Sequence, residues 1–267
     1  MSRLSDVFAR CQTEQRTALV GYLTAGDPDV AASEVLLQAL AGQVDVLEIG
    51  MPFSDPMADG PVIQAASERA LASNTHMDDV FRLTAKVRAE HPELGIVLMG
   101  YANIPFVMGF ETFAQQAVAV GADAVLLVDI PPEEGHICDT IFQKHGLDRI
   151  LLLSPTSNDE RIRLACSHAS GFIYYVSLNG ITGADMGAVA GIEQQVQRIR
   201  QHTDLPICVG FGVKTPQQAA DIGAFSDGVV VGSHFVRMIP EQQGQTMQVA
   251  EQLAHEAASL RQAMLRS

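Results

Sequence analysis

The chain has 267 residues, of which 47% are hydrophobic and 18% charged. This is enough apolar material for a large folded core, and it excludes an intrinsically disordered chain. The 17 basic and 31 acidic residues give a formal net charge of −14, which repels nucleic acid and anionic lipid at long range. Binding to nucleic acid or to a membrane surface is therefore not expected, whereas backbone donors could still hold a small anionic substrate.

Eight short aliphatic runs predict β-strands, and each is followed by a helical pattern. In chain order the predicted strands are Ala18–Leu23, Val44–Ile49, Gly95–Met99, Ala124–Val128, Arg149–Leu153, Phe172–Val176, Pro206–Val209 and Gly228–Val231. The wide gap after the second strand contains two predicted helices, Pro61–Ala72 and Met77–Glu90. Two further helices are predicted at the ends of the chain, at Ser2–Gln12 and Glu241–Leu265.

The predicted strands are continuously apolar, which is typical of a parallel sheet covered by helices. Eight strands that alternate with helices favour a single (β/α)8 TIM barrel domain over residues 1–267, with an N-terminal extra helix and an additional helix after strand two. The N-terminal helix could plug the bottom of the barrel. A doubly wound open sheet is the alternative, because sequence alone does not exclude a topological switch point.

The cellular compartment is predicted from three features. The N-terminal sequence lacks the basic-then-apolar pattern of a signal peptide, and the longest uncharged stretch, Gly95–Phe110, is too short to span a membrane. Four widely spaced cysteines form no Cys-x-x-Cys pair: Cys11, Cys138, Cys166 and Cys208. A soluble, cytoplasmic protein with buried thiols is expected.

Glu48 is the first candidate catalytic residue, because barrel active sites lie at the C-terminal ends of the strands. Alternation along strand two places Glu48 on the same side as Val44 and Val46, which predicts that it faces the barrel interior. A carboxyl group among aliphatic side chains has a raised pKa and can exchange protons near neutral pH. The alternative is a structural ion pair, but no strand interior offers an obvious basic partner.

Asp59 is the second candidate, in the long loop between Gly50 and Pro61. Loops of this length within a compact domain usually serve a function. Asp55 lies in the same loop, and either aspartate could be a solvated turn residue. Capping of the helix that begins at Pro61 is the structural alternative for Asp59.

Glycines at the ends of the last three strands predict a phosphate site, because their backbone N–H groups can approach an anion closely. The residues concerned are Gly183, Gly212, Gly232 and Ser233, and the only nearby cation is Lys214.

Motifs for metals and cofactors are missing. Gly210–Thr215 has Thr in place of the third glycine of a dinucleotide fingerprint, His255-Glu256 lacks the second zincin histidine, and no Walker loop is present. No metal and no cofactor are expected in this chain.

The segment Leu47–Pro61 closely resembles the signature of the tryptophan synthase alpha subunit family. The match is long and unbroken, and similar segments occur along essentially the whole chain: Gly21–Pro28, Met99–Asn103, Val128–Pro131, Gly180–Gly183, Gly210–Val213 and Val231–Ser233. This resemblance implies a lyase of L-tryptophan biosynthesis that cleaves indole-3-glycerol phosphate to indole and glyceraldehyde 3-phosphate, without a metal or an organic cofactor.

By the same resemblance, Glu48 would be the acid/base that protonates the indole ring carbon, and Asp59 would interact with the indole N–H. Tyr22, Met99, Leu126, Phe211 and either Leu152 or Leu153 would form the indole slot, and Tyr174 would line the same pocket. Gly183, Gly212, Gly232 and Ser233 match the phosphate site, and Thr182 lies in a loop that contacts the Asp59 loop in the family.

The resemblance also implies a partner, a beta subunit that holds pyridoxal phosphate and receives indole within an α2β2 heterotetramer. Pro52, Asp55, Asn103 and Phe106 would face that partner. One departure is Leu178-Asn179, where members of the family have Arg followed by a small residue. Three alternatives stay open: a stand-alone indole-3-glycerol phosphate lyase, another phosphate-binding barrel enzyme, and a catalytically silent barrel acting as an allosteric subunit.

Overall fold

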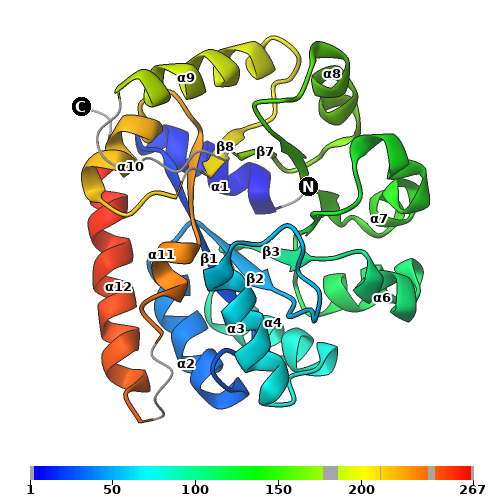
Figure 1. Cartoon of the computed structure of the whole chain (residues 1–267), viewed down its shortest axis with the longest axis vertical. Helices are drawn as coiled ribbons and strands as arrows, with labels where there is room; N and C mark the ends of the chain where they lie inside the picture. Colours follow the sequence, from blue (N-terminus) through cyan, green and yellow to red (C-terminus); the bar gives the residue numbers. More distant parts are fainter. Residues whose placement is uncertain (1–2, 177–185, 211, 240–243, 266–267) are drawn as a thin grey trace.

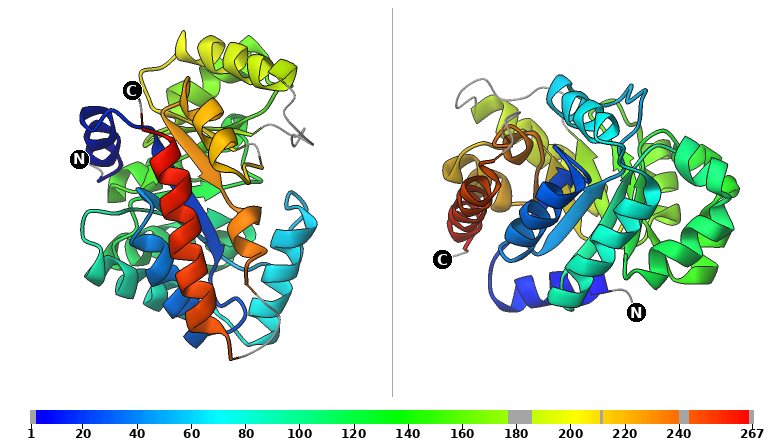
Figure 2. Two further views of the ribbon diagram at one scale, coloured as in Figure 1. Left: turned by 90° about the vertical axis from the view of Figure 1, so that its left-hand side faces the viewer. Right: turned by 90° about the horizontal axis from the view of Figure 1, so that it is seen from below.

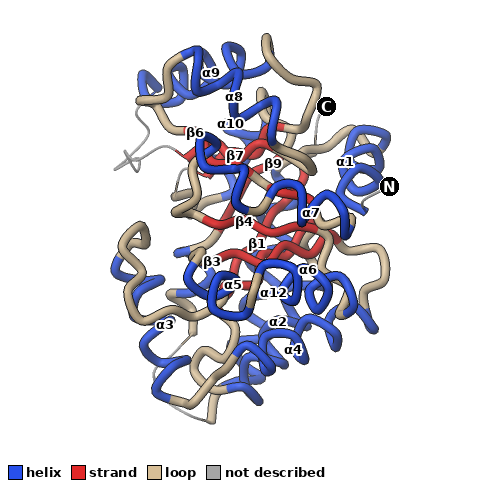
Figure 3. The backbone as a smooth tube through the Cα atoms, turned by 90° about the vertical axis from the view of Figure 1, so that its right-hand side faces the viewer, coloured by secondary structure: helices blue, strands red, loops and turns tan. Residues whose placement is uncertain are grey.

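The computed structural model describes residues 3–176, 186–210, 212–239 and 244–265. Its strands are β1 (Ala18–Thr24), β2 (Val46–Gly50), β3 (Gly95–Gly100), β4 (Ala124–Leu127), β5 (Asp148–Arg149), β6 (Leu151–Leu153), β7 (Ile173–Val176), β8 (Ile207–Gly210) and β9 (Gly228–Val231). All the pairings between these strands are parallel, in the order β5-β4-β3-β2-β1-β9-β8-β7-β6. The strands form the centre of the molecule and the helices surround them (Figures 1 and 3).

The predicted fifth strand is divided into β5 and β6, and this division closes the barrel. β5 pairs with β4, whereas β6 pairs with β7. Ile150 lies between them, and its N–H donates to the carbonyl of Val125 at 3.0 Å. Because the two edges of the sheet are contiguous in the chain, the ring is a (β/α)8 barrel, and the alternative of an open doubly wound sheet is excluded.

The helices follow the strands as predicted. They are α1 (Arg3–Thr13), α2 (Val30–Ala41), α3 (Pro61–Ala72), α4 (Met77–Glu90), α5 (Asn103–Met108), α6 (Phe110–Ala119), the 3-10 helix η1 (Pro132–Ile137), α7 (Asp139–His145), α8 (Asp159–His168), α9 (Met186–Arg200), α10 (Pro216–Gly223), α11 (Ser233–Val236) and α12 (Thr246–Ala263). The extra helix after strand two is confirmed, because both α3 and α4 lie between β2 and β3.

The core has two layers, one inside the barrel and one between the strands and the outer helices. The inner layer contains Val20, Val46 and Leu126, and α1 adds Leu4 and Phe8 to it from the bottom of the barrel. The right-hand view of Figure 2 shows α1 at the opposite end of the barrel from α3. The prediction that the N-terminal helix plugs the barrel is confirmed.

One detail of the predicted alternation is wrong. Val46 packs in the inner layer, and Glu48, two residues later, points to the same side of the strand. Val44 instead packs in the outer layer against Gly21. The reason is that β2 begins at Val46, so the two-residue period of a strand does not extend back to Val44.

When β5 and β6 are counted as one strand, every second strand of the barrel is preceded by the same hydrogen bond. A side chain shortly before β2, β4, β7 or β9 accepts a backbone N–H of the strand that comes before it in the barrel. The four pairs are Leu19 with Asp45 at 2.9 Å, Ile96 with Asp123 at 2.8 Å, Arg149 with Ser170 at 2.9 Å, and Ile207 with Asp227 at 2.9 Å. These side chains satisfy backbone donors at the bottom of the barrel, where the ladder begins.

Asp45→Asn is expected to lower the free energy of unfolding by about 3–5 kcal/mol, because it leaves the buried guanidinium of Arg16 without its bidentate partner. Asp227→Asn is the matched control, since Asp227 occupies the same position but pairs with the more exposed Arg200. Asp227→Asn should lower the free energy of unfolding by about 1 kcal/mol. Urea unfolding measures both values, and equal losses would contradict the role assigned to burial.

Candidate active site

A cavity of about 420 Å³ opens at the C-terminal ends of the strands. Residues from the ends of several strands, from the start of α3 and from α11 line it: Tyr22, Glu48, Asp59, Gly60, Pro61, Val62, Ile63, Met99, Tyr174, Val176, Gly210, Gly212, Val230, Gly232, Ser233 and Arg237. Two carboxyl groups and two phenols thus meet one mostly apolar space. Its volume is within the range of small-molecule sites.

Glu48 lies on β2, opposite Tyr22 in the register of β1 and β2. Its side chain is buried, and its Oε1 atom has no hydrogen-bond partner among the residues that the structure describes. Burial raises the pKa of this carboxyl group to about 8, in the direction predicted from its aliphatic neighbours. Glu48 is therefore mostly protonated at neutral pH, and it lines the cavity.

Asp59 lies in the loop between β2 and α3 and is half-buried. Its Oδ2 accepts a hydrogen bond from the Tyr101 hydroxyl at 3.1 Å, and that hydroxyl accepts the Ala58 N–H at 3.0 Å. Burial raises the pKa of Asp59, and the hydrogen bond from Tyr101 partly offsets this shift. Gly60 caps the helix without a side-chain bond, so the carboxylate of Asp59 is not used as the cap.

Tyr101 is a residue that the sequence analysis did not assign to the site. It follows β3 and is buried, and its ring stacks on Phe53 with centroids 5.2 Å apart. Burial raises the pKa of its phenol to about 12, so the hydroxyl remains a donor to Asp59. Its place in the family-like segment Met99–Asn103 was the available signal, but only the fold brings it to Asp59.

Tyr22 and Tyr174 line the cavity with buried side chains, and desolvation raises the pKa of both phenols. Each hydroxyl lies over a strand-end glycine. A Cβ atom at Gly50 would meet the Tyr22 hydroxyl at 2.1 Å, and one at Gly210 would meet the Tyr174 hydroxyl at 2.6 Å. These glycines are therefore needed for the close approach of the two rings to the backbone.

The predicted apolar slot is only partly assembled at the cavity. Met99 lines it, whereas Leu126 is fully buried in the inner layer and is not among the lining residues. Leu126 pairs with the lining residue Met99 in the register of β3 and β4, so the two side chains come from neighbouring strands at the same level of the barrel. Of the two leucines left open, Leu152 packs on the inner layer and Leu153 belongs to the outer layer.

The predicted phosphate residues Gly212, Gly232 and Ser233 all line the cavity, and Gly212 has φ of +66°. Thr182, Gly183 and Phe211 lie outside the described residues. Lys214, the cation noted near the glycine motif, is exposed and does not line the cavity, whereas Arg237 does and is the one cation among the described lining residues. Spacing from the glycine motif suggested Lys214, but Arg237 reaches the cavity from the far end of α11.

The residues predicted to face a partner differ in exposure. Asp55, Asn103 and Phe106 are exposed, whereas Pro52 is buried. Large apolar side chains are exposed in the same two segments, at Met57, Phe106 and Val107, with exposed fractions of 79%, 69% and 75%.

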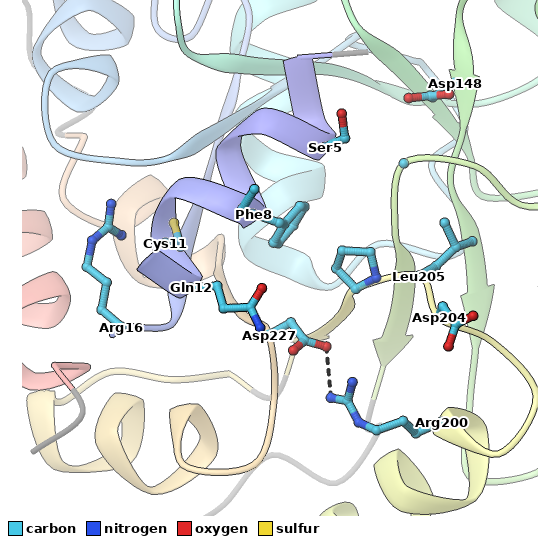
Figure 4. A pocket seen from close by; sticks show the side chains of 13 residues that line it. Ser5, Phe8, Cys11, Gln12, Arg16, Asp148, Arg200, Asp204, Leu205 and Asp227 are labelled. Carbon is cyan, nitrogen blue, oxygen red and sulfur yellow. Dashed lines mark hydrogen bonds and ion pairs between the residues drawn. The ribbon is translucent and has the colours of Figure 1, made fainter. Parts of the chain in front are cut away.

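A second and larger pocket, of about 680 Å³, lies at the opposite end of the barrel, between α1 and the beginnings of several strands (Figure 4). Phe8 and Leu205 line it together with the ion pair of Arg200 and Asp227, whose atoms are 2.8 Å apart. None of the predicted site residues lies there. The chemistry is therefore expected at the smaller cavity.

The raised pKa of Glu48 predicts a pH dependence of stability. Between the usual value of 4.5 and about 8, the folded state holds a proton that the unfolded state has lost. The corresponding stability is present below pH 4.5 and is lost as the pH rises through 8, at about 1.4 kcal/mol for each pKa unit. Urea unfolding from pH 5 to pH 9 should show wild type losing several kcal/mol relative to Glu48→Gln. If the stability of wild type and that of Glu48→Gln changed equally with pH, the raised pKa of Glu48 would be contradicted.

Among the described residues, no group of three or more His, Cys, Asp and Glu side chains is placed to hold a metal ion. In the same part of the chain, no helix has the length and apolar character needed to cross a membrane. The four cysteines are free; Cys11, Cys138 and Cys208 are buried as predicted, and Cys166 is half-buried.

Comparisons with known proteins agree with the resemblance. The family model described as tryptophan synthase alpha chain matches residues 8–265. The tryptophan synthase alpha chain of Zymomonas mobilis is 47% identical over 90% of this chain and 88% of its own, and that of Halorhodospira halophila is 47% identical over 99% and 97%. The crystal structure of tryptophan synthase subunit alpha from Legionella pneumophila superposes with a TM-score of 0.90 at 40% identity, covering 99% of this chain and 98% of that one.

Proposed function

The chain belongs to the tryptophan synthase alpha chain family, and we propose that its cavity performs the family's reaction with Glu48 and Asp59 as the catalytic pair. The reaction is the cleavage of indole-3-glycerol phosphate to indole and glyceraldehyde 3-phosphate in tryptophan biosynthesis, so the chain is a lyase. One observation above all supports the assignment of residues. A buried carboxyl group with a pKa of about 8 lines the cavity, and its Oε1 atom has no hydrogen-bond partner among the described residues.

The protonated carboxyl of Glu48 donates its proton to the indole ring carbon that bears the glycerol phosphate side chain. This makes the ring an indolenine-like cation, which draws electrons from the carbon–carbon bond. As that bond breaks, its electron pair restores the indole ring and the adjacent hydroxyl becomes the aldehyde. The Glu48 carboxylate takes up the hydroxyl proton, so no net proton is consumed.

Asp59 supplies a fixed negative charge for the positive charge that develops on the indole nitrogen. Its carboxylate is half-buried and hydrogen-bonded to Tyr101, whereas Glu48 is buried and its Oε1 atom has no partner among the described residues. Two carboxyl groups in unlike environments can take an acid role and an ionised role at the same pH. In a cavity with a mostly apolar lining, the ionised group stabilises the cation more strongly than it would in solution.

The remaining lining residues would bind and orient the substrate. Tyr22, Met99 and Tyr174 offer apolar surface for the indole ring, and backbone N–H groups at Gly212, Gly232 and Ser233 are proposed to hold the phosphate. Phosphate binding far from the reacting carbon supplies energy for orientation. Leu126, Thr182, Gly183 and Phe211 remain predictions from the resemblance.

We propose that the chain needs no cofactor of its own and works in an α2β2 complex, in which the beta subunit holds the pyridoxal phosphate. The exposed apolar side chains of Met57, Phe106 and Val107, close in sequence to Asp55 and Asn103, support an interface there. Pro52 would shape that surface from beneath, since it is buried.

A single-domain chain in the cytoplasm is also proposed. The barrel uses strands from β1 to β9. The residue before β1 contacts the residue after α12, since the Thr17 N–H donates to the Met264 carbonyl at 3.2 Å.

The test is indole release from indole-3-glycerol phosphate by the purified chain, dialysed against a chelator and assayed without pyridoxal phosphate. Weak release alone that rises strongly when a beta subunit is added would support both the reaction and the partner. Equal release with and without the beta subunit would indicate a stand-alone lyase. No release in either case would overturn the proposed function.

A further inference from the structure

Arg237 lies directly after α11, and its backbone continues the helical conformation with φ −64° and ψ −20°. Its N–H donates to the carbonyl of Ser233 at 3.2 Å, one helical turn earlier. Residues four apart share a helix face, and helical side chains point back towards the N-terminus. The side chain of Arg237 is therefore directed towards Ser233, and both residues line the active-site cavity.

The charge of Arg237 is not used within the described part of the chain. No hydrogen bond or ion pair joins its guanidinium to a described residue, whereas Arg16, Arg69 and Arg149 are each held by an aspartate. Among the described lining residues, Arg237 is the one cation, and the acidic side chains are Glu48, which is mostly protonated at neutral pH, and Asp59. The cavity thus combines two acidic side chains with an arginine that has no partner among the described residues.

A phosphate monoester is largely a dianion at neutral pH, since its second pKa is about 6. Backbone N–H groups are neutral donors, and both the Asp59 carboxylate and the net charge of −14 repel a dianion. A guanidinium presents a planar pair of donors that matches two phosphate oxygens. We propose that Arg237 binds the phosphate of the substrate as its cationic contact, an inference that rests on the proposed function.

Glycerol 3-phosphate and indole are the two probes for this role, because one carries the phosphate and the other does not. Calorimetry with Arg237→Gln should show glycerol 3-phosphate binding weakened by about ten- to a hundredfold, with indole binding unchanged. In steady-state kinetics, KM for indole-3-glycerol phosphate should rise in parallel, while kcat stays within about threefold. Arg237→Lys should recover most of the affinity, because it restores the charge.

Two controls separate this role from a general effect of charge or structure. Arg163→Gln removes an exposed arginine of α8 that does not line the cavity, and Lys214→Gln removes the cation suggested by the sequence. Both should leave glycerol 3-phosphate binding within about twofold of wild type. The proposal is overturned if Arg237→Gln binds this ligand normally, if it loses indole binding equally, or if Lys214→Gln carries the loss instead.

Failure of this inference is distinguishable from failure of the proposed function. If wild type releases indole and Arg237→Gln is unaffected, the function stands and the role of Arg237 is wrong. If wild type releases no indole but binds glycerol 3-phosphate through Arg237, the phosphate contact stands and the proposed function is wrong.

Discussion

Replacing Glu48 with Gln should reduce indole release by about a thousandfold or more while the protein still binds glycerol 3-phosphate. Gln has nearly the same shape as Glu but no proton that it can transfer, so the substitution removes the chemistry and preserves the packing. The Oε1 position already lacks a partner among the described residues, so the amide breaks no existing hydrogen bond at that atom. Single-turnover kinetics and calorimetry measure the two effects separately.

Glu68→Gln is the matched control, since Glu68 is an exposed glutamate on α3 outside the cavity. It should cleave at the wild-type rate. If Glu48→Gln also cleaves at a near-normal rate, the acid/base role of Glu48 is wrong. If Glu48→Gln loses glycerol 3-phosphate binding as well, the loss of cleavage reports damage to the cavity rather than loss of a proton donor.

The second large effect is expected for Asp59→Asn, with kcat about a hundred- to a thousandfold lower and KM changed much less. The amide keeps the size of the side chain and can still accept the hydrogen bond from Tyr101, but it removes the charge that faces the indolenine-like cation. Only the transition state carries that positive charge. The loss should therefore appear in kcat.

Asp55→Asn provides the control within the same loop, because Asp55 is exposed and its carboxylate bonds only to the hydroxyl of its neighbour Ser54 among the described residues. Measured without a beta subunit, it should keep the wild-type rate. A loss in Asp55→Asn equal to that in Asp59→Asn would mean that the charge of the loop, and not the position of Asp59, is what matters. An increase confined to KM in Asp59→Asn would assign this residue to binding.

The site was predictable where a residue's role follows from its own strand. Glu48 is in phase with Val46 along β2, and its burial and raised pKa follow from that phase. Gly212, Gly232 and Ser233 were predictable because a barrel places the ends of its strands together. Tyr101 and Arg237 were not, because their positions depend on how a loop and a short helix pack over the barrel mouth.

By itself, the sequence determined the strands, the plug helix, the extra helix after strand two and the family, because hydrophobic period and motif are local properties. The tertiary structure alone decided that the fifth strand divides at Ile150 to close the ring. It also brought Arg237, and not Lys214, to the cavity. The pairing of strands and the entry of a long side chain into a cavity depend on contacts between residues far apart in the chain. No local sequence pattern predicts such contacts.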